Sequence, residues 1–452
     1  VMATLSAFRG GFSRDAAEQV ASANLRLLLT LVNQSLLQRR PDGYFTMHEL
    51  LRQFAAARRR ESLSGVEAEL AHARYFARMV KTETDRLGDY APVHLPERLA
   101  GDTENLYRAW FYAIDHGLAD AAADLSSGLY ALANAQGLPA ETLFDHGLQT
   151  LARGGVAETH PAMLRLRLIA LVWLEGFRVA LAVKQACLDF VPLATRHADS
   201  KLLFQLYCLL TNTCRWTGDP QALTWAERAA YIAGAQQDEL ALVTAAAYAD
   251  NARVTLGLSE PNTLSRLESH RAYLEERPAP GSLIFEVLES LQTEALTRGD
   301  FGQALDYGRR LLNMAKGFRN MYGISVAGYS LASTCVRLGR PAQAARHLLD
   351  VLDWHVAVAK TWQTLGCLMS ICIFPEPLGY EDEAVAVLSM VYHHPQTIRR
   401  FQNQIDAARP RLQTALGVET FATAWEQGKV LDYDTAMART RAALMALQDQ
   451  SI

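Results

Sequence analysis

A series of regularly spaced glycines is the feature that most constrains the fold of this 452-residue chain. Each glycine ends a stretch in which apolar residues recur at three- and four-residue steps, as on a buried helix face. A glycine after a helix commonly supplies the left-handed conformation that reverses the chain. The glycines are Gly137, Gly176, Gly218, Gly257, Gly299, Gly339, Gly379 and Gly417, at intervals of 38 to 42 residues. The spacing predicts an all-α fold, an α/α superhelix with one helical hairpin about every 40 residues.

Small residues follow these glycines at a fixed distance. Ala304, Ala344 and Ala384 each come five residues after a turn glycine, where we expect the two helices of a hairpin to approach closely. The turn Gly299-Asp300-Phe301-Gly302-Gln303-Ala304 resembles the Gly-Asp-aromatic-x-x-Ala turn of tetratricopeptide repeats, with a period longer than the usual length of about 34 residues. The resemblance covers residues 131–452 and implies a repeat domain that binds a partner.

The first sixty residues have a different pattern. They predict three short helices (2–8, 14–20 and 25–33), two short strands (36–39 and 44–47) across the turn Pro41-Asp42-Gly43, and a closing helix (48–60). This order is typical of a small winged-helix domain with a β-hairpin. We therefore predict a winged-helix domain at 1–61, a helical connector at 62–130 and the repeat domain at 131–452.

Several segments resemble the STAND signalling ATPases, which include the NB-ARC proteins and bacterial transcriptional regulators. The winged helix of that family is resembled by three segments, Phe8-Arg9-Gly10-Gly11-Phe12, Leu31-Val32-Asn33-Gln34-Ser35-Leu36-Leu37 and Met47-His48-Glu49-Leu50-Leu51. The family's connector is resembled by Thr103-Glu104-Asn105-Leu106 with Ala109-Trp110. The end of its bacterial sensors is resembled by Ala424-Trp425-Glu426-Gln427-Gly428-Lys429 with 433–439. In that family a nucleotide-binding domain precedes the winged helix, and a repeat sensor follows it. The resemblance implies that this chain is a sensor region, which binds a protein or small-molecule inducer and relays the event to an N-terminal NTPase domain.

His48 is the candidate nucleotide-sensing residue that the resemblance implies. The family pattern Met-His-Asp places a histidine against the nucleotide's phosphate in the resting, ADP-bound form, and here Glu49 stands in place of the aspartate. The alternative is a histidine that only caps the closing helix. A nucleotide-sensing role requires ADP or ATP in the full-length protein, and we expect no cofactor in this chain itself.

Polar residues inside the first helices of the hairpins are candidates for ligand contact. They are Asn212, Arg215, Asp250, Asn251, Arg253, Gln292, Glu294 and Arg337. In a superhelix such residues can line the concave groove. Ordinary hydrogen bonding between neighbouring repeats is an equally weighted alternative.

The sequence offers no catalytic or metal-binding centre. It contains no Gly-x-x-x-x-Gly-Lys-Ser/Thr loop, so we expect no ATP hydrolysis. Its histidines never stand three or four residues apart, and its six cysteines lack the close pairs of zinc or redox motifs, so we expect them to be reduced core residues. Ser330 is part of a predicted helix rather than of the strand-to-helix turn that a hydrolase nucleophile needs.

Charge and hydropathy limit the partners. With 44 basic and 48 acidic residues the net charge is -4, which does not favour nucleic acid. A phosphate-binding face near the predicted hairpin and closing helix could be formed by Arg39, Arg40, Arg58, Arg59 and Arg60. We favour a structural role, because Arg58 to Arg60 suit the negative end of a helix dipole. The helix at 25–33 is apolar and predicted to be buried, so DNA recognition is not expected. The absence of a leader or membrane-length apolar run predicts a cytoplasmic protein without membrane contact. The alternative to a sensor region is a free-standing tetratricopeptide scaffold.

Overall fold

The fold of the chain is helical, as the sequence predicts. The computed structural model describes residues 1–60, 64–87, 99–136, 141–177, 180–276, 283–317, 321–358, 361–373, 380–397 and 399–449. In these ranges the only other regular elements are a 3₁₀ turn at Ala100–Asp102 and one small antiparallel hairpin. The chain divides into two compact units, residues 1–174 with 189–206 and residues 175–188 with 207–452. The domain boundaries predicted from the sequence stay predictions.

The elements at the N-terminus follow the predicted order. They are α1 (Met2–Leu5), α2 (Arg14–Ala21), α3 (Leu25–Asn33), β1 (Gln38–Arg39), β2 (Phe45–Thr46) and α4 (Glu49–Arg60). Ser13 caps α2 and Asn24 caps α3, each by accepting a backbone N–H two or three residues into the helix. Arg39 pairs with Phe45 in the hairpin, and Phe45 also exchanges two backbone hydrogen bonds with Phe12. The strands are shorter than predicted because pairing stops after two residues on each side.

The prediction that the helix at 25–33 is buried is only half right. Leu28 and Leu31 of α3 are buried, whereas Leu25 is 37% exposed and Leu29 is 39% exposed. An isolated helix on the surface of a small domain buries one face alone, and α3 presents its second apolar face to solvent.

The core of the N-terminal segment continues into the helix that follows it. Phe8 stacks on Phe12 with ring centroids 4.6 Å apart, and its edge meets Phe76 of α5 (Ser64–Leu87) at 6.2 Å. Buried Asn105 of α7 (Thr103–Asp115) accepts the N–H of Arg9 at 2.7 Å and donates to the carbonyl of Gly11 at 2.7 Å. Two segments that carry the family resemblance, 8–12 and 103–106, are thus held together by hydrogen bonds.

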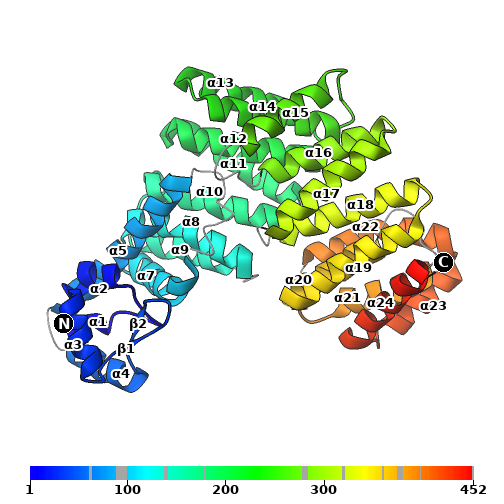
Figure 1. Ribbon diagram of the computed structural model, residues 1–452. Coiled ribbons are helices and arrows are strands. Elements are labelled where there is room, and N and C mark those ends of the chain that lie inside the picture. The colour runs from blue at the N-terminus through cyan, green and yellow to red at the C-terminus, as the bar shows by residue number, and fades with distance from the viewer. Residues whose placement is uncertain are drawn as a thin grey trace. The chain divides into compact units, whose positions relative to one another are not determined.

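The remaining helices follow one another along the chain. They are α8 (Ala119–Gln136), α9 (Glu141–Arg153), α10 (Pro161–Phe177), α11 (Ala180–His197), α12 (Ser200–Trp216), α13 (Gln221–Gln236), α14 (Glu239–Thr255), α15 (Thr263–Glu275), α16 (Leu283–Thr297), α17 (Phe301–Gly317), α18 (Met321–Arg337), α19 (Pro341–Val358), α20 (Thr361–Cys372), α21 (Glu381–His393), α22 (Arg399–Leu416), α23 (Val418–Gly428) and α24 (Tyr433–Asp449). Within the second unit, α16 to α19 lie side by side in sequence order, and the first helices α14, α16 and α18 also pack on one another (Figure 1). Near the C-terminus, α24 packs against α19 and α21.

The turn glycines have the conformation that the sequence predicts. Gly218, Gly257, Gly299 and Gly339 follow α12, α14, α16 and α18 with φ between +69° and +79°, and Gly417 has φ +80° between α22 and α23. Other residues adopt this left-handed region only with strain. Gly176 differs from the prediction because it lies inside the last turn of α10, and Gly137 and Gly379 are outside the described residues.

The alanines after these turns are buried between helices, which gives a direct test of the repeat register. Ala344, near the start of α19, is fully buried, and its neighbour Gln343 is exposed. Ala344→Phe is expected to reduce the free energy of unfolding by about 1 to 3 kcal/mol, because the larger ring must force α19 away from α18. Gln343→Phe is the control and should change it by less than about 0.5 kcal/mol. Equal losses in urea denaturation of the two variants would show that the register is wrong.

Three further findings concern the cysteines, membrane-spanning helices and metal ligands. All six cysteines are buried and none forms a disulfide. In the described ranges no helix is long and apolar enough to cross a membrane, and no group of histidine, cysteine and acidic side chains could hold a metal ion.

Candidate functional site

The candidate ligand residues lie on the first helices of consecutive hairpins in the second unit. Asn212 and Arg215 come from α12, Asp250, Asn251 and Arg253 from α14, Gln292 and Glu294 from α16, and Arg337 from α18. All of them are buried except Arg253, which is partly exposed, and Arg337, which is exposed. The structure therefore places most of them between helices. It separates them into two hydrogen-bonded groups, two unbonded amides, Glu294, which bonds to Ser259 at 2.6 Å and to Arg298 at 2.8 Å, and the exposed Arg337.

Arg215 is the centre of the first group. Its guanidinium donates to Asn212 Oδ1 at 2.5 Å, to Thr255 Oγ1 of α14 at 3.4 Å and to Glu286 Oε2 of α16 at 2.7 Å. The side chain is only 2% exposed, and its Cζ lies 4.5 Å from the ring centre of Trp216. One arginine thus connects the first helices of three successive hairpins.

Glu289 lies one turn after Glu286 on α16 and adds a second carboxylate to this group. Burial raises the pKa of Glu286, against the attraction of Arg215. Burial also raises the pKa of Glu289 to about 7, and the charge of Glu286 adds to this effect while that of Arg215 opposes it. A single arginine cannot neutralise both carboxylates, so the group favours a proton on Glu289. We call Asn212, Arg215, Thr255, Glu286 and Glu289 the α12–α16 cluster.

Asp250 is the centre of the second group, which lies within the hairpin of α14 and α15. Its carboxylate bonds to Arg253 at 2.9 Å, to Arg266 at 2.7 Å and to His270 Nε2 at 3.1 Å. Burial alone would raise the pKa of Asp250, but the hydrogen bonds and charges of His270 and Arg266 lower it to about 2. Asp250 therefore joins α14 to α15 through Arg266 and His270, and Arg253 bonds to Asp250 on the same helix. These bonds are the structural alternative to ligand contact.

Two buried amides have no hydrogen-bond partner among the described residues. Asn251 is completely buried, one turn before Thr255 on the same helix, and neither of its amide atoms is bonded. Gln292 is 1% exposed, and both of its amide atoms are also unbonded. A buried polar atom without a partner costs about 1 to 3 kcal/mol, so these amides are suited to groups that a ligand or water would supply.

Sequence reasoning missed the two acidic residues of the α12–α16 cluster. Glu286 and Glu289 are three residues apart, and Gln292 follows after three more, so all three project from one side of α16. That spacing was a usable signal. The pairing of Glu286 with Arg215 was not predictable, because 71 residues separate the two.

His48, the other candidate, lies in the first unit at the start of α4. It is exposed, and its Nδ1 accepts the backbone N–H of Leu50 at 3.3 Å. This contact is the capping role that the sequence leaves open. On the next two turns, Leu50 is 70% exposed and Phe54 is 65% exposed, so an apolar strip on α4 faces solvent directly beside His48.

Comparison with known proteins finds one informative likeness. No protein-family model and no curated protein matches the chain. Among solved structures, it is similar to a signal transduction ATPase with numerous domains (STAND) that has a tetratricopeptide repeat sensor, from Pyrococcus horikoshii, with a TM-score of 0.53 and 11% sequence identity. The likeness covers 98% of this chain and 64% of that protein. At this identity it shows a shared helical-repeat fold, and the chain spans about two thirds of its neighbour's length.

Proposed function

We propose that this chain is the non-catalytic sensor region of a STAND-type ATPase, which binds a protein or small-molecule inducer in its helical array. The observation that carries the proposal is the structural likeness to a STAND protein with a tetratricopeptide repeat sensor, over 98% of this chain. Such coverage must include most of residues 1–61, the predicted winged helix, as well as the repeats. It leaves 36% of the neighbour for other parts, since the chain spans 64% of that protein.

The exposed surface of α4 supports the proposal that another domain docks on this helix. Leu50 and Phe54 are one turn apart and expose most of their apolar side chains, which is unusual for a surface without a partner. His48 lies at the same end of the helix. We assign this strip to the nucleotide-binding domain of the same polypeptide, because the family order places that domain immediately before the winged helix.

The α12–α16 cluster and the unbonded amides Asn251 and Gln292 are the proposed point of inducer contact. A ligand with hydrogen-bond donors would bond to the carboxylate of Glu289 and to the amide oxygens. If the ligand changes the spacing of α12, α14 and α16, that change would be transmitted along the stacked hairpins. In a solenoid each repeat contacts only its neighbours, so a local rearrangement shifts the repeats on both sides.

The coding sequence upstream of Val1 separates this proposal from a free-standing tetratricopeptide scaffold. A sensor region requires a phosphate-binding loop, Gly-x-x-x-x-Gly-Lys-Ser/Thr, in the same reading frame. A frame without such a loop would overturn the proposal and leave the scaffold as the function of the chain.

His48→Ala is expected to speed ADP release from the protein that contains this chain and its nucleotide-binding domain. Loss of one charge-assisted hydrogen bond to phosphate corresponds to about tenfold or more in the dissociation rate. His160→Ala is the matched control, because His160 Nδ1 accepts the N–H of Ala162 at 3.2 Å and so caps α10 as His48 caps α4. Release of a fluorescent ADP analogue measures both variants. If His48→Ala and His160→Ala release ADP at the same rate, His48 is only a helix cap.

A further inference from the structure

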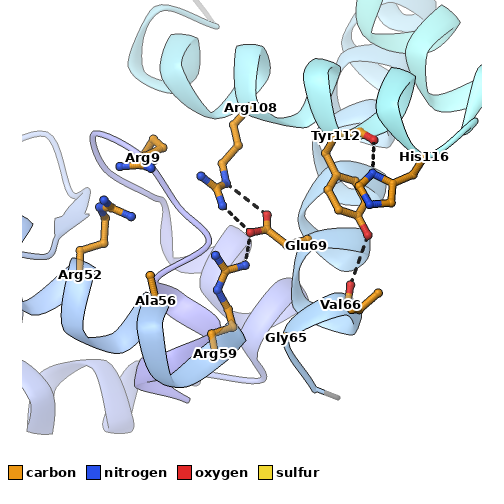
Figure 2. Close-up of a pocket in the computed structure, with 10 residues that line it drawn as sticks. All are labelled: Arg9, Arg52, Ala56, Arg59, Gly65, Val66, Glu69, Arg108, Tyr112 and His116. Carbon is orange, nitrogen blue, oxygen red and sulfur yellow. Dashed lines mark hydrogen bonds and ion pairs between the residues drawn. The ribbon is translucent and has the colours of Figure 1, made fainter. Parts of the chain in front are cut away.

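A pocket rich in arginine lies in the first unit, where α4, α5 and α7 meet. Its volume is about 380 Å³, which is within the range of about 300 to 1,000 Å³ for small-molecule sites. Figure 2 shows that the guanidinium groups of Arg9, Arg52, Arg59 and Arg108 approach the same space from the loop after α1, from α4 and from α7. His48 does not line this pocket, and the array contributes nothing to it.

The first pair of arginines shares one carboxylate. Arg108 Nε donates to Glu69 Oε2 at 3.2 Å, and Arg59 Nη1 and Arg108 Nη2 both donate to Glu69 Oε1. Burial acts to raise the pKa of Glu69, but the hydrogen bonds and charges of Arg108 and Arg59 lower it overall. Glu69 is therefore ionised, and this trio carries one surplus positive charge.

The second pair also shares one carboxylate. Arg52 donates to Glu49 through Nε at 2.7 Å and Nη2 at 2.6 Å. Arg9 Nη1 is 3.7 Å from Glu49 Oε1, which is too long for a hydrogen bond. Glu104 also acts on Arg9, so four guanidinium groups and the carboxylates of Glu69, Glu49 and Glu104 leave a net positive charge around the pocket.

Part of the donor capacity around the pocket is unused. Within the described residues, Nη1 of Arg52 and Nη1 of Arg108 have no hydrogen-bond partner, and Arg9 has only the long contact to Glu49. Burial lowers the pKa of Arg9, and the positive charges of Arg52 and Arg108 lower it further, while the carboxylates of Glu49 and Glu104 act in the opposite direction without cancelling this effect.

The start of α5 forms another wall and adds to the positive potential. A Cβ on Gly65 would lie 2.1 Å from the carbonyl oxygen of Arg59, so only glycine lets the first turn of α5 approach α4 so closely. The first N–H groups of a helix have no partner within the helix, and its N-terminus carries a partial positive charge. The glycine thus places a helix N-terminus beside the arginine cluster.

We propose that this pocket binds the phosphate group of a small phosphorylated molecule. The planar guanidinium fork matches phosphate oxygens in a bidentate manner, and the surplus positive charge of the pocket attracts an anionic phosphomonoester. The pocket is larger than a phosphate group, so it has room for an organic part next to Tyr112. Binding would join the segment after α1 to α4 and α7, which is the region between the hairpin segment and the repeats.

Calorimetric titration of the 452-residue chain with inorganic phosphate and with glucose 6-phosphate tests the proposal. Saturable one-to-one binding is expected for both ligands, and tighter binding of the ester would identify a phosphorylated metabolite rather than free phosphate. Affinity should fall as the salt concentration rises. Arg9→Gln should weaken binding about tenfold or more, because it removes a charge-assisted contact. Arg108→Gln should do the same if it folds.

Arg14→Gln is the control. It removes the same charge from an exposed arginine of α2, whose ion pair with Glu18 is 3.9 Å long. Binding to Arg14→Gln should equal that of the unmodified chain. The proposal is wrong if neither ligand binds saturably, or if Arg9→Gln, which leaves the bonds of Glu69 intact, binds as tightly as Arg14→Gln.

Discussion

Gly428→Ala is expected to lower the free energy of unfolding by about 3 kcal/mol, at the upper end of the usual cost of overpacking. Gly428 ends α23, where that helix packs against α21. A Cβ at this position would lie 2.1 Å from the carbonyl oxygen of Ala386 and 2.6 Å from Cβ of Ser389. The nearest obstacle is backbone rather than a flexible side chain, so the two helices must separate.

Gly234→Ala is the matched control, since Gly234 also lies in a helix, α13. A Cβ there would meet nothing closer than Leu242 Cδ2 at 4.0 Å. Alanine should stabilise this helix by about 0.5 to 1 kcal/mol, because it loses less conformational entropy on folding than glycine does. Urea denaturation followed by circular dichroism compares the two variants. If both raise the unfolding midpoint, the close contact between α21 and α23 does not exist.

Glu289→Gln is expected to change the pH dependence of stability by about 3 kcal/mol. The pKa of Glu289 is about 7 in the folded chain, against its ordinary value of 4.5. A carboxyl whose folded pKa is raised contributes stability that is complete below pH 4.5 and is lost as the pH rises through 7. A rise of the pKa from 4.5 to about 7 corresponds to roughly 3 kcal/mol. Glutamine resembles the protonated acid and cannot ionise, so the variant should exceed the native chain in stability at pH 8 and match it near pH 4.5.

The measurement is the urea midpoint of both proteins at pH 4.5 and at pH 8. Glu227→Gln, at an exposed position on α13, is the control and should shift both midpoints alike. A difference between Glu289→Gln and the native chain that is the same at both pH values would show that Glu289 is not buried beside Glu286. The prediction also bears on function, because an inducer that donates a hydrogen bond to Glu289 would change its protonation.

The sequence predicted the features that depend on local chemistry. The chain reverses with positive φ at Gly218, Gly257, Gly299 and Gly339. Glycine is the residue that adopts this conformation without strain, so its presence in the sequence indicates the turn. Ser13 and Asn24 likewise signal the starts of α2 and α3. Gly176 shows the limit of this reasoning, because a glycine inside the last helical turn has the same spacing as one just beyond it.

The sites could be predicted only in part. The sequence pattern identified Arg215 and Asn251 as polar residues on the first helices of the hairpins. It did not indicate which of the polar residues form hydrogen bonds. Asp250 proved to bond to Arg266 and His270 across its hairpin, and Arg253 to bond to Asp250 on the same helix. The side-chain amides of Asn251 and Gln292 have no described partner. The arginine pocket could not be predicted at all. Arg9 and Arg108 are 99 positions apart, so no local spacing marks them as neighbours. For Arg59 the sequence favoured a helix-end role over a phosphate-binding face.

The nucleotide content of the protein purified from its natural source tests the central claim most directly. A sensor region belongs to a switch that rests with ADP bound, so the intact protein should release about one ADP per polypeptide on denaturation, as measured by ion-exchange chromatography. His48→Ala should lower that amount in parallel with faster ADP release, whereas His160→Ala should leave it unchanged. Intact protein that contains no bound nucleotide would contradict the sensor account and favour a free-standing scaffold.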